Sequence, residues 1–131
     1  MRCVARALTL AAILLVAGCS LFRDSDVQVA RITSIVAPDT VRVDSAFHAT
    51  ATACLGPNSG YVLDRFEVNS SGAELTVQAW SRFSPEGGAV YEVVVYQDLG
   101  VGASSDEPGD FRIIAIQPDG RDTLKTITVL P

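Results

Sequence analysis

From residue 27 to the end of this 131-residue chain, apolar side chains recur at nearly every second position. The clearest case is the run 47–54, where Ala49, Ala51 and Ala53 alternate with a histidine and two threonines. A period of two is the repeat of a β-strand, whose successive side chains point to opposite faces. Turn-forming residues interrupt the pattern roughly every 8–14 residues, as in all-β domains. The expected strands cover 27–35, 41–54, 61–68, 75–83, 89–97, 111–117 and 124–130.

About seven short strands without a helical pattern predict an all-β domain, an antiparallel Ig-like β-sandwich over residues 27–131. Closure into a barrel is the alternative. A parallel β-helix is excluded because no short repeat of fixed period occurs. The segments 108–115 and 126–129, joined by Asp119-Gly120, resemble the closing hairpin of bacterial Ig-like and PKD-like domains. This resemblance supports the fold and implies no activity.

Several local features of the strands are also expected. The alternation changes phase at Asp64-Arg65, which predicts a β-bulge. The dense apolar run 89–97 predicts a central strand covered on both faces. Segment 98–110 is then the longest predicted loop. Residues 118–121 are predicted to form a hairpin turn with Asp119-Gly120 in the type I′ positions.

The first 18 residues have the composition of an export signal. Arg2 and Arg6 give a positive start, and a mainly apolar run extends from Ala7 to Ala17. At about 1.5 Å per residue this run spans about 16 Å, roughly half of a ~30 Å hydrocarbon core. It is therefore too short for a comfortable permanent span.

The residues Val16-Ala17-Gly18-Cys19 resemble the bacterial lipobox, an aliphatic residue and two small residues before a cysteine. The resemblance implies that residues 1–18 are a lipoprotein signal peptide that is cleaved, and that the Cys19 sulfur carries a diacylglycerol. The new amino terminus is usually acylated as well, and two or three acyl chains hold a protein firmly on a bilayer. Ser20 implies the outer membrane by the same resemblance. An ordinary secretory signal and an uncleaved anchor helix are the alternatives.

Residues 19–26 are then the lipidated cysteine and a short tether. Its seven residues after the cysteine reach at most about 25 Å, so the domain is expected close to the membrane. Loss of Arg2 and Arg6 leaves eight basic against 15 acidic residues, a formal net charge of −7. Such a surface argues against nucleic acid as a partner. Cys54 is left without a disulfide partner, and we interpret it as a small buried hydrophobe. A reactive or intermolecularly bridged thiol is the alternative.

Candidate chemistry is sparse. His48 is the one histidine, and it lies six residues from Cys54 on the same strand face, about 20 Å away at ~3.4 Å per residue. A Cys–His pair is therefore not expected. The acidic segment 98–110 carries four carboxylates without regular spacing, which we interpret as a solvated loop rather than a Ca²⁺ site. The sequence predicts no catalytic residues, no cofactor and no metal site, and hence no enzyme.

Aromatic residues offer a candidate ligand patch. Trp80, Tyr61 and Tyr96, with Tyr91 nearby in sequence, are the residues from which a surface for an envelope protein or a glycan would be built. Trp80 is expected on the strand face opposite Val77. The favoured function is accordingly a membrane-anchored, non-catalytic Ig-like binding or structural module of the cell envelope.

A second hypothesis concerns protease inhibition. Gly56-Pro57-Asn58-Ser59-Gly60-Tyr61 and the Gly87-Gly88 pair faintly resemble the two loops of chagasin-type cysteine-protease inhibitors. Those inhibitors place an Asn-Pro-Thr-Thr-Gly-aromatic loop and a Gly-rich loop at one end of an Ig-like fold. Here Asn and Pro are in reversed order and the Thr pair is missing, so only Gly60-Tyr61 matches. The resemblance implies an inhibitor that uses loops 56–60 and 84–88.

Overall fold

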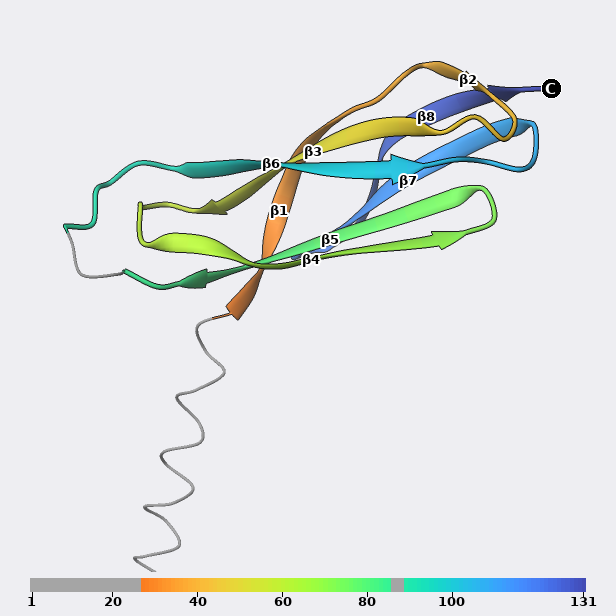
Figure 1. The fold of residues 1–131 in the computed structure, drawn as a ribbon. Helices are drawn as coiled ribbons and strands as arrows, with labels where there is room; N and C mark the ends of the chain where they lie inside the picture. Colours follow the sequence, from red (N-terminus) through yellow and green to blue (C-terminus); the bar gives the residue numbers. More distant parts are fainter. Residues whose placement is uncertain (1–26, 86–88) are drawn as a thin grey trace, which may run out of the picture.

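The computed structural model describes residues 27–85 and 89–131, so the predicted signal peptide, Cys19 and the tether lie outside the described residues. The described chain is built from strands (Figure 1), which confirms the all-β prediction. Eight strands occur there instead of about seven, because Asp44, at a φ of 60°, turns the chain inside the predicted run 41–54. The strands are β1 (Val27–Val36), β2 (Thr40–Arg42), β3 (Phe47–Gly56), β4 (Tyr61–Ser71), β5 (Glu74–Phe83), β6 (Val95–Ala103), β7 (Gly109–Gln117) and β8 (Gly120–Leu130).

All these strands join one hydrogen-bonded sheet in the order β2-β8-β7-β5-β1-β3-β6, with β4 on the other edge of β5. β1 pairs with β5 as far as Ala30 and with β3 from Arg31 onward. It therefore links two parts of the sheet. The five-stranded part consists of β2, β8, β7, β5 and β4, and the three-stranded part consists of β1, β3 and β6.

The expectation of a purely antiparallel sheet is wrong, because the sheet is mixed. β5 pairs with β7 in parallel through residues 74–77, and β2 pairs with β8 in parallel. Tight hairpins force antiparallel pairing, but neither of these pairs is joined by one. The chain leaves β5, passes through β6 in the three-stranded part and only then returns as β7.

The main core is shared by both parts of the sheet. Phe47 of the three-stranded part meets Phe111 of the five-stranded part edge to face, with ring centroids 5.7 Å apart. Aromatic pairs favour this geometry. Ala49 and Ala51 are buried in the same cluster, as their alternation predicts. The buried cluster comprises Ile32, Phe47, Ala49, Ala51, Leu75, Val77, Val101, Phe111, Ile113, Ala115, Ile127 and Val129.

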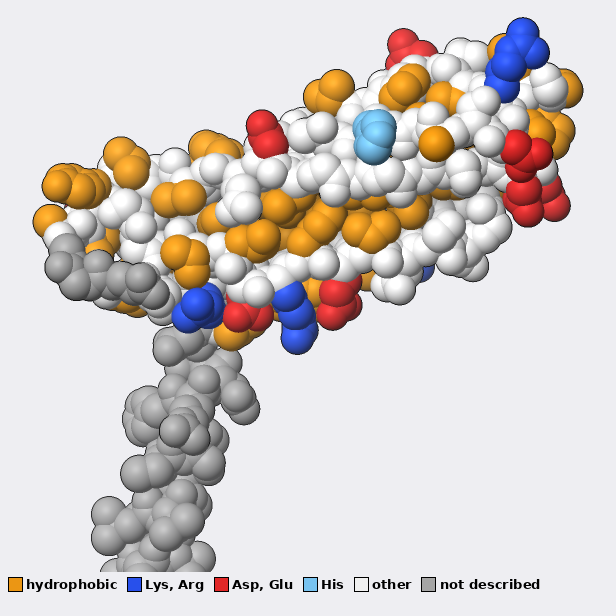
Figure 2. Space-filling view, in the orientation of Figure 1, with side chains coloured by type: hydrophobic (Ala, Val, Ile, Leu, Met, Phe, Trp, Pro, Cys, Tyr) orange, Lys and Arg blue, Asp and Glu red, His pale blue; other side chains and the backbone are white. Residues whose placement is uncertain are grey.

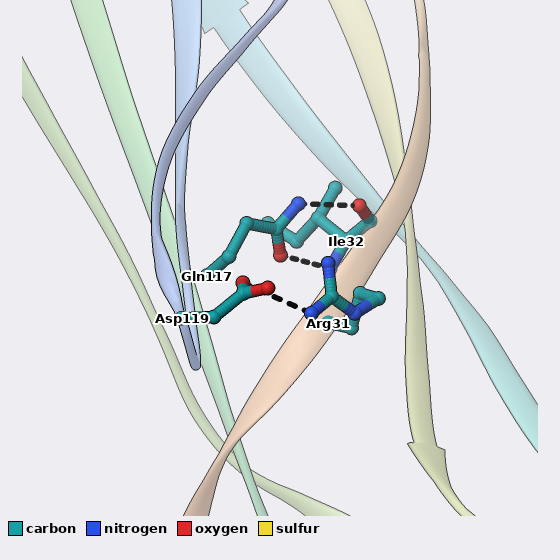
Figure 3. A network of polar contacts seen from close by, with 4 residues as sticks. All are labelled: Arg31, Ile32, Gln117 and Asp119. Carbon is teal, nitrogen blue, oxygen red and sulfur yellow. Dashed lines mark hydrogen bonds and ion pairs between the residues drawn. The ribbon is translucent and has the colours of Figure 1, made fainter.

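A buried glutamine supports β1 where it passes from β5 to β3. The Gln117 side chain accepts a hydrogen bond from the Ile32 N–H at 2.9 Å and donates one to the Ile32 carbonyl at 2.8 Å (Figure 3). A shift of register lies immediately beyond, between Ile32 and Ser34. Buried backbone groups need partners, and here a side chain supplies both.

The structure confirms the predicted bulge and the predicted hairpin, but not the type of the hairpin turn. The register shift between Leu63 and Arg65 confirms the bulge predicted at Asp64-Arg65. The predicted hairpin is present, with Gln117 paired to Gly120. The predicted turn type is wrong. Pro118 and Asp119, and not Asp119 and Gly120, occupy the two central positions. Of Asp119 and Gly120, only Gly120 has a positive φ, at 146°. A type I′ turn needs a positive φ at both central residues.

The prediction of a central strand over residues 89–97 is also wrong. β6 begins only at Val95, which pairs with Gly56 at the end of β3, so the residues before it have no strand to pair with there. β6 pairs with β3 alone and lies at the end of the strand order. The predicted loop 98–110 is correspondingly shorter, because residues 98–103 belong to β6. Gly100 and Gly102, which were predicted to lie in this loop, pair with Thr50 and His48 in the β3–β6 strand pair.

Candidate functional site

The three aromatic residues predicted to form a ligand patch do not share one surface. Trp80 is half-buried on the face of β5 opposite the buried Val77, as predicted, and the Arg65 guanidinium lies 4.0 Å from its ring centroid. Tyr61 is paired with Phe83, an odd number of positions from Trp80, and so projects from the other face. Tyr96 belongs to β6 in the three-stranded part and is exposed beside Cys54.

Tyr61 instead helps to build one end of the molecule. Its ring lies 5.3 Å from the Phe83 ring, and it packs against a second, smaller core cluster. Glycines make room for both rings: a Cβ on Gly56 would lie 2.2 Å from the Tyr61 ring, and a Cβ on Gly60 would lie 2.4 Å from the Phe83 ring. Such separations are far below van der Waals contact, so the loop 56–60 can pack on this end only with glycine at these positions.

The loop 56–60 lies beside the segment that follows β5. The Ser84 N–H donates to the Gly60 carbonyl at 2.7 Å, and the Ser59 N–H donates to the Tyr91 carbonyl at 2.9 Å. The Tyr91 N–H donates in return to the Ser59 hydroxyl at 2.7 Å. The two loops predicted from the inhibitor resemblance are thus neighbours, although residues 86–88 of the second lie outside the described part of the chain.

An exposed apolar cluster covers this end, and we call it the apolar end. Tyr91 is 66% exposed, Tyr96 58%, Val93 55% and Val94 53%. Figure 2 shows apolar side chains at the left end of the molecule, and others along its middle and at its right end. Most charged side chains in view lie at the right end and along the lower edge. The apolar end consists of Phe83, Val90, Tyr91, Val93, Val94 and Tyr96.

Sequence reasoning missed this surface because it placed the same residues inside a covered strand. The sequence carries no signal that separates the two cases, because the consecutive Val93, Val94 and Val95 are equally typical of a strand covered on both faces. β1 also begins nearby: Val27, 41% exposed, pairs with Arg82, the residue before Phe83.

The other candidate residues stay apart. His48 is exposed opposite Gly102, and Cys54 is half-buried opposite Tyr96, six positions along the same strand. The Thr52 hydroxyl donates to the Asp98 carboxylate at 2.7 Å on this face. Among residues 27–85 and 89–131, no three His, Cys, Asp or Glu side chains gather in a way that could hold a metal ion.

Among residues 27–85 and 89–131, two carboxyl groups have shifted pKa values, and both belong to ion pairs between strands or turns. The hydrogen bond from Lys125, followed by its positive charge, lowers the pKa of Asp39. The hydrogen bond from Arg31, 2.9 Å away, lowers the pKa of Asp119, with help from a backbone hydrogen bond and the Arg31 charge. Neither carboxyl belongs to the apolar end.

Comparison of the chain with protein-family models, with curated proteins and with solved structures gave no match in any of the three. In the part of the chain that the structure describes, no helix is long and apolar enough to cross a membrane.

Proposed function

We propose that this chain is a bacterial lipoprotein, anchored through Cys19 and carrying a non-catalytic binding or structural module in the cell envelope. The order of its segments supports the proposal. A positive start, an apolar run and the lipobox-like Val16–Cys19 are followed within eight residues by β1. A domain that begins so soon after an acylated cysteine stays close to the bilayer.

The proposed domain is an Ig-like β-sandwich whose two layers are the five-stranded and the three-stranded parts. The shared core favours this, because side chains of both parts interdigitate around Phe47 and Phe111. Passage of β1 from one part to the other through the register shift near Thr33 is compatible with a sandwich, since bulges and bends let strands change sheets.

Metabolic labelling tests the anchor. Cells that express the full chain are grown with radiolabelled palmitate, and the protein is then recovered from membrane and soluble fractions. The wild type is expected to be labelled and to sediment with membranes, and Cys19→Ser is expected to be unlabelled and unprocessed. Cys3→Ser is the matched control, because it removes a thiol from the signal without touching the lipobox and should change neither result. Labelling of Cys19→Ser would refute the assignment.

The outer membrane is the proposed destination, from the identity of Ser20. Separation of inner and outer membranes on a density gradient tests this. The wild type is expected in the outer-membrane fractions, and Ser20→Asp is expected to move toward the inner membrane. Identical distributions of the two proteins would remove the destination from the proposal.

The proposed partner is an envelope protein or a glycan, and Trp80 is the side chain proposed to contact it. Trp80 and Arg65 form a stacked pair on the outer face of β5 and β4, a geometry that can hold a sugar ring or an aromatic side chain. Retention of envelope material by the full chain, and its loss in Trp80→Ala, is the expected result. Equal retention by both proteins would exclude this face.

Cysteine-protease inhibition is the second candidate function, and one observation favours it. Loop 56–60 is hydrogen-bonded to Ser84, the first residue of loop 84–88, and to Tyr91, which follows that loop. Two loops that enter one cleft must be neighbours in this way. Titration of papain with the lipidated protein in detergent tests it. Inhibition at micromolar protein, lost on Tyr61→Ala, is expected under this hypothesis, and full protease activity at those concentrations would eliminate it.

A further inference from the structure

We propose that the apolar end lies against the same bilayer that holds the acyl chains, so that the domain rests on the membrane in a fixed orientation instead of swinging on its tether. This inference depends on the proposed lipid anchor at Cys19. It adds a second membrane contact, made by the six side chains of the apolar end.

The first argument is the chemistry of this surface. Four of its six side chains are more than half exposed, and they lie close together in sequence beside Val95. From Phe83 to Tyr96 the sequence contains no Lys or Arg. Contiguous apolar groups of this kind mark interaction surfaces in soluble domains. Tyrosines are enriched where a membrane meets water, because the ring is apolar and the hydroxyl stays hydrated. Tyr91 and Tyr96 thus suit the headgroup region.

The second argument is the position of Val27, the N-terminal residue of the described domain. Val27, the first residue of β1, is paired with Arg82, and Phe83 follows directly. The tether between Cys19 and Val27 reaches at most about 25 Å. A bilayer that holds Cys19 is therefore within reach of the apolar end. The anchor also keeps the local lipid concentration high, so a contact too weak to bind a free protein becomes populated.

The third argument is the distribution of charge. β6 runs from Val95 at the apolar end to Ala103, nine residues or about 30 Å away, and the exposed Asp106, Glu107 and Asp110 follow it there. Bacterial membranes carry anionic lipid, which repels carboxylates. An orientation with the apolar end on the lipid keeps these groups far from the surface. The segment from Phe83 to Tyr96 contains two carboxylates, Glu86 and Glu92, and Glu86 lies outside the described residues. Glu92 is exposed, so its carboxylate can stay hydrated among the headgroups.

Fluorescence quenching by lipid tests the orientation. The full lipidated protein is placed in phosphatidylethanolamine–phosphatidylglycerol vesicles, with and without lipid brominated near the top of the acyl chains. Trp80→Phe removes the natural tryptophan, and Tyr91→Trp then places a single tryptophan in the apolar end. Leu130→Trp in the same background is the matched control. Leu130 is also exposed, but it pairs with Arg42 at the end of the molecule away from the apolar end. At that end the Asp44 N–H donates to the Ser105 carbonyl.

The tryptophan at position 91 is expected to lose at least half of its emission to brominated lipid, and the tryptophan at position 130 is expected to lose none. Val93→Ser/Val94→Ser should reduce the quenching at position 91 without releasing the protein from vesicles. Equal, weak quenching at both positions in protein that floats with vesicles would overturn the docking and leave the anchor intact. Protein that does not float would overturn both. Unquenched but blue-shifted emission at position 91, with crosslinked dimers, would assign the surface to a second copy.

Discussion

At the scale of single residues, Gln117 has the clearest structural role. β1 must leave β5 to reach β3, and at that point Ile32 would lose its backbone partners inside the core. The Gln117 amide replaces them with one acceptor and one donor, while its side chain remains 5% exposed. A primary amide is the natural choice, because it carries both groups without a charge.

We predict that Gln117→Leu lowers the free energy of unfolding by about 2–4 kcal/mol, because it buries an unpaired N–H and an unpaired carbonyl of Ile32. Urea unfolding measures the change. Gln97→Leu serves as a control for the same substitution at an exposed position and should stay within about 0.5 kcal/mol of wild type. Equal effects of the two substitutions would show that the Gln117 hydrogen bonds contribute nothing.

The ion pair of Arg31 and Asp119 gives a prediction about pH. Its carboxyl has a pKa below the ordinary 3.8, so its stabilising contribution is present above pH 3.8 and is lost as the pH falls through the lower, folded-state value. Asp119→Asn should therefore flatten the acid limb of stability against pH. The pair is on the surface, so the effect is small. Asp122→Asn, in the same hairpin, is the control, and an identical acid limb for both variants would exclude the linkage.

At the scale of elements, features set by local sequence could be predicted and features set by distant partners could not. The bulge at Asp64-Arg65 follows from a change of alternation within one strand, and the hairpin around Pro118 follows from its turn residues. The segment 89–94 has a strong strand composition, yet β3 ends at Gly56 and offers it no edge. Composition predicts what a segment can form, whereas pairing depends on where the partner ends.

The two parallel strand pairs could not be predicted from the sequence, because they too depend on partners that are distant along the chain. Nothing in residues 74–77 or 112–115 indicates that they run in the same direction, because that depends on the path of the chain through β6. The predicted aromatic patch failed for the same reason, because the relative orientation of side chains on neighbouring strands depends on how the strands pair. Spacing placed Trp80 on the correct face of its strand, but it could not show that Tyr61 faces the opposite way on the neighbouring strand.

The packing of loop 56–60 can be tested at this scale. Gly56→Ala should destabilise the fold by about 1–3 kcal/mol, because a Cβ there overlaps the Tyr61 ring, and overpacking at a buried site has this cost. Gly100→Ala is the control, since a Cβ at that strand position meets nothing within 4 Å. Thermal unfolding followed by circular dichroism compares the two. Retained stability in Gly56→Ala would mean that the Tyr61 ring moves aside freely.

At the scale of the whole molecule, the proposed function joins three features in one arrangement. In the proposed arrangement a lipid at Cys19 holds the chain, β1 begins eight residues later, and the apolar end lies next to the start of β1. We expect the charged residues beyond β6, which are exposed, to face away from the bilayer in this arrangement. The fold creates the apolar end and the charged opposite end, but the proposed contact of the apolar end with a bilayer depends on the anchor at Cys19.

The mass of the intact mature protein tests that anchor most directly. The protein is extracted from membranes with detergent and measured without digestion. The account predicts a chain of residues 19–131 plus the mass of a diacylglycerol, with a further acyl chain where the amino terminus is modified. An unmodified mass for a chain that starts elsewhere, or one that retains residues 1–18, would contradict it.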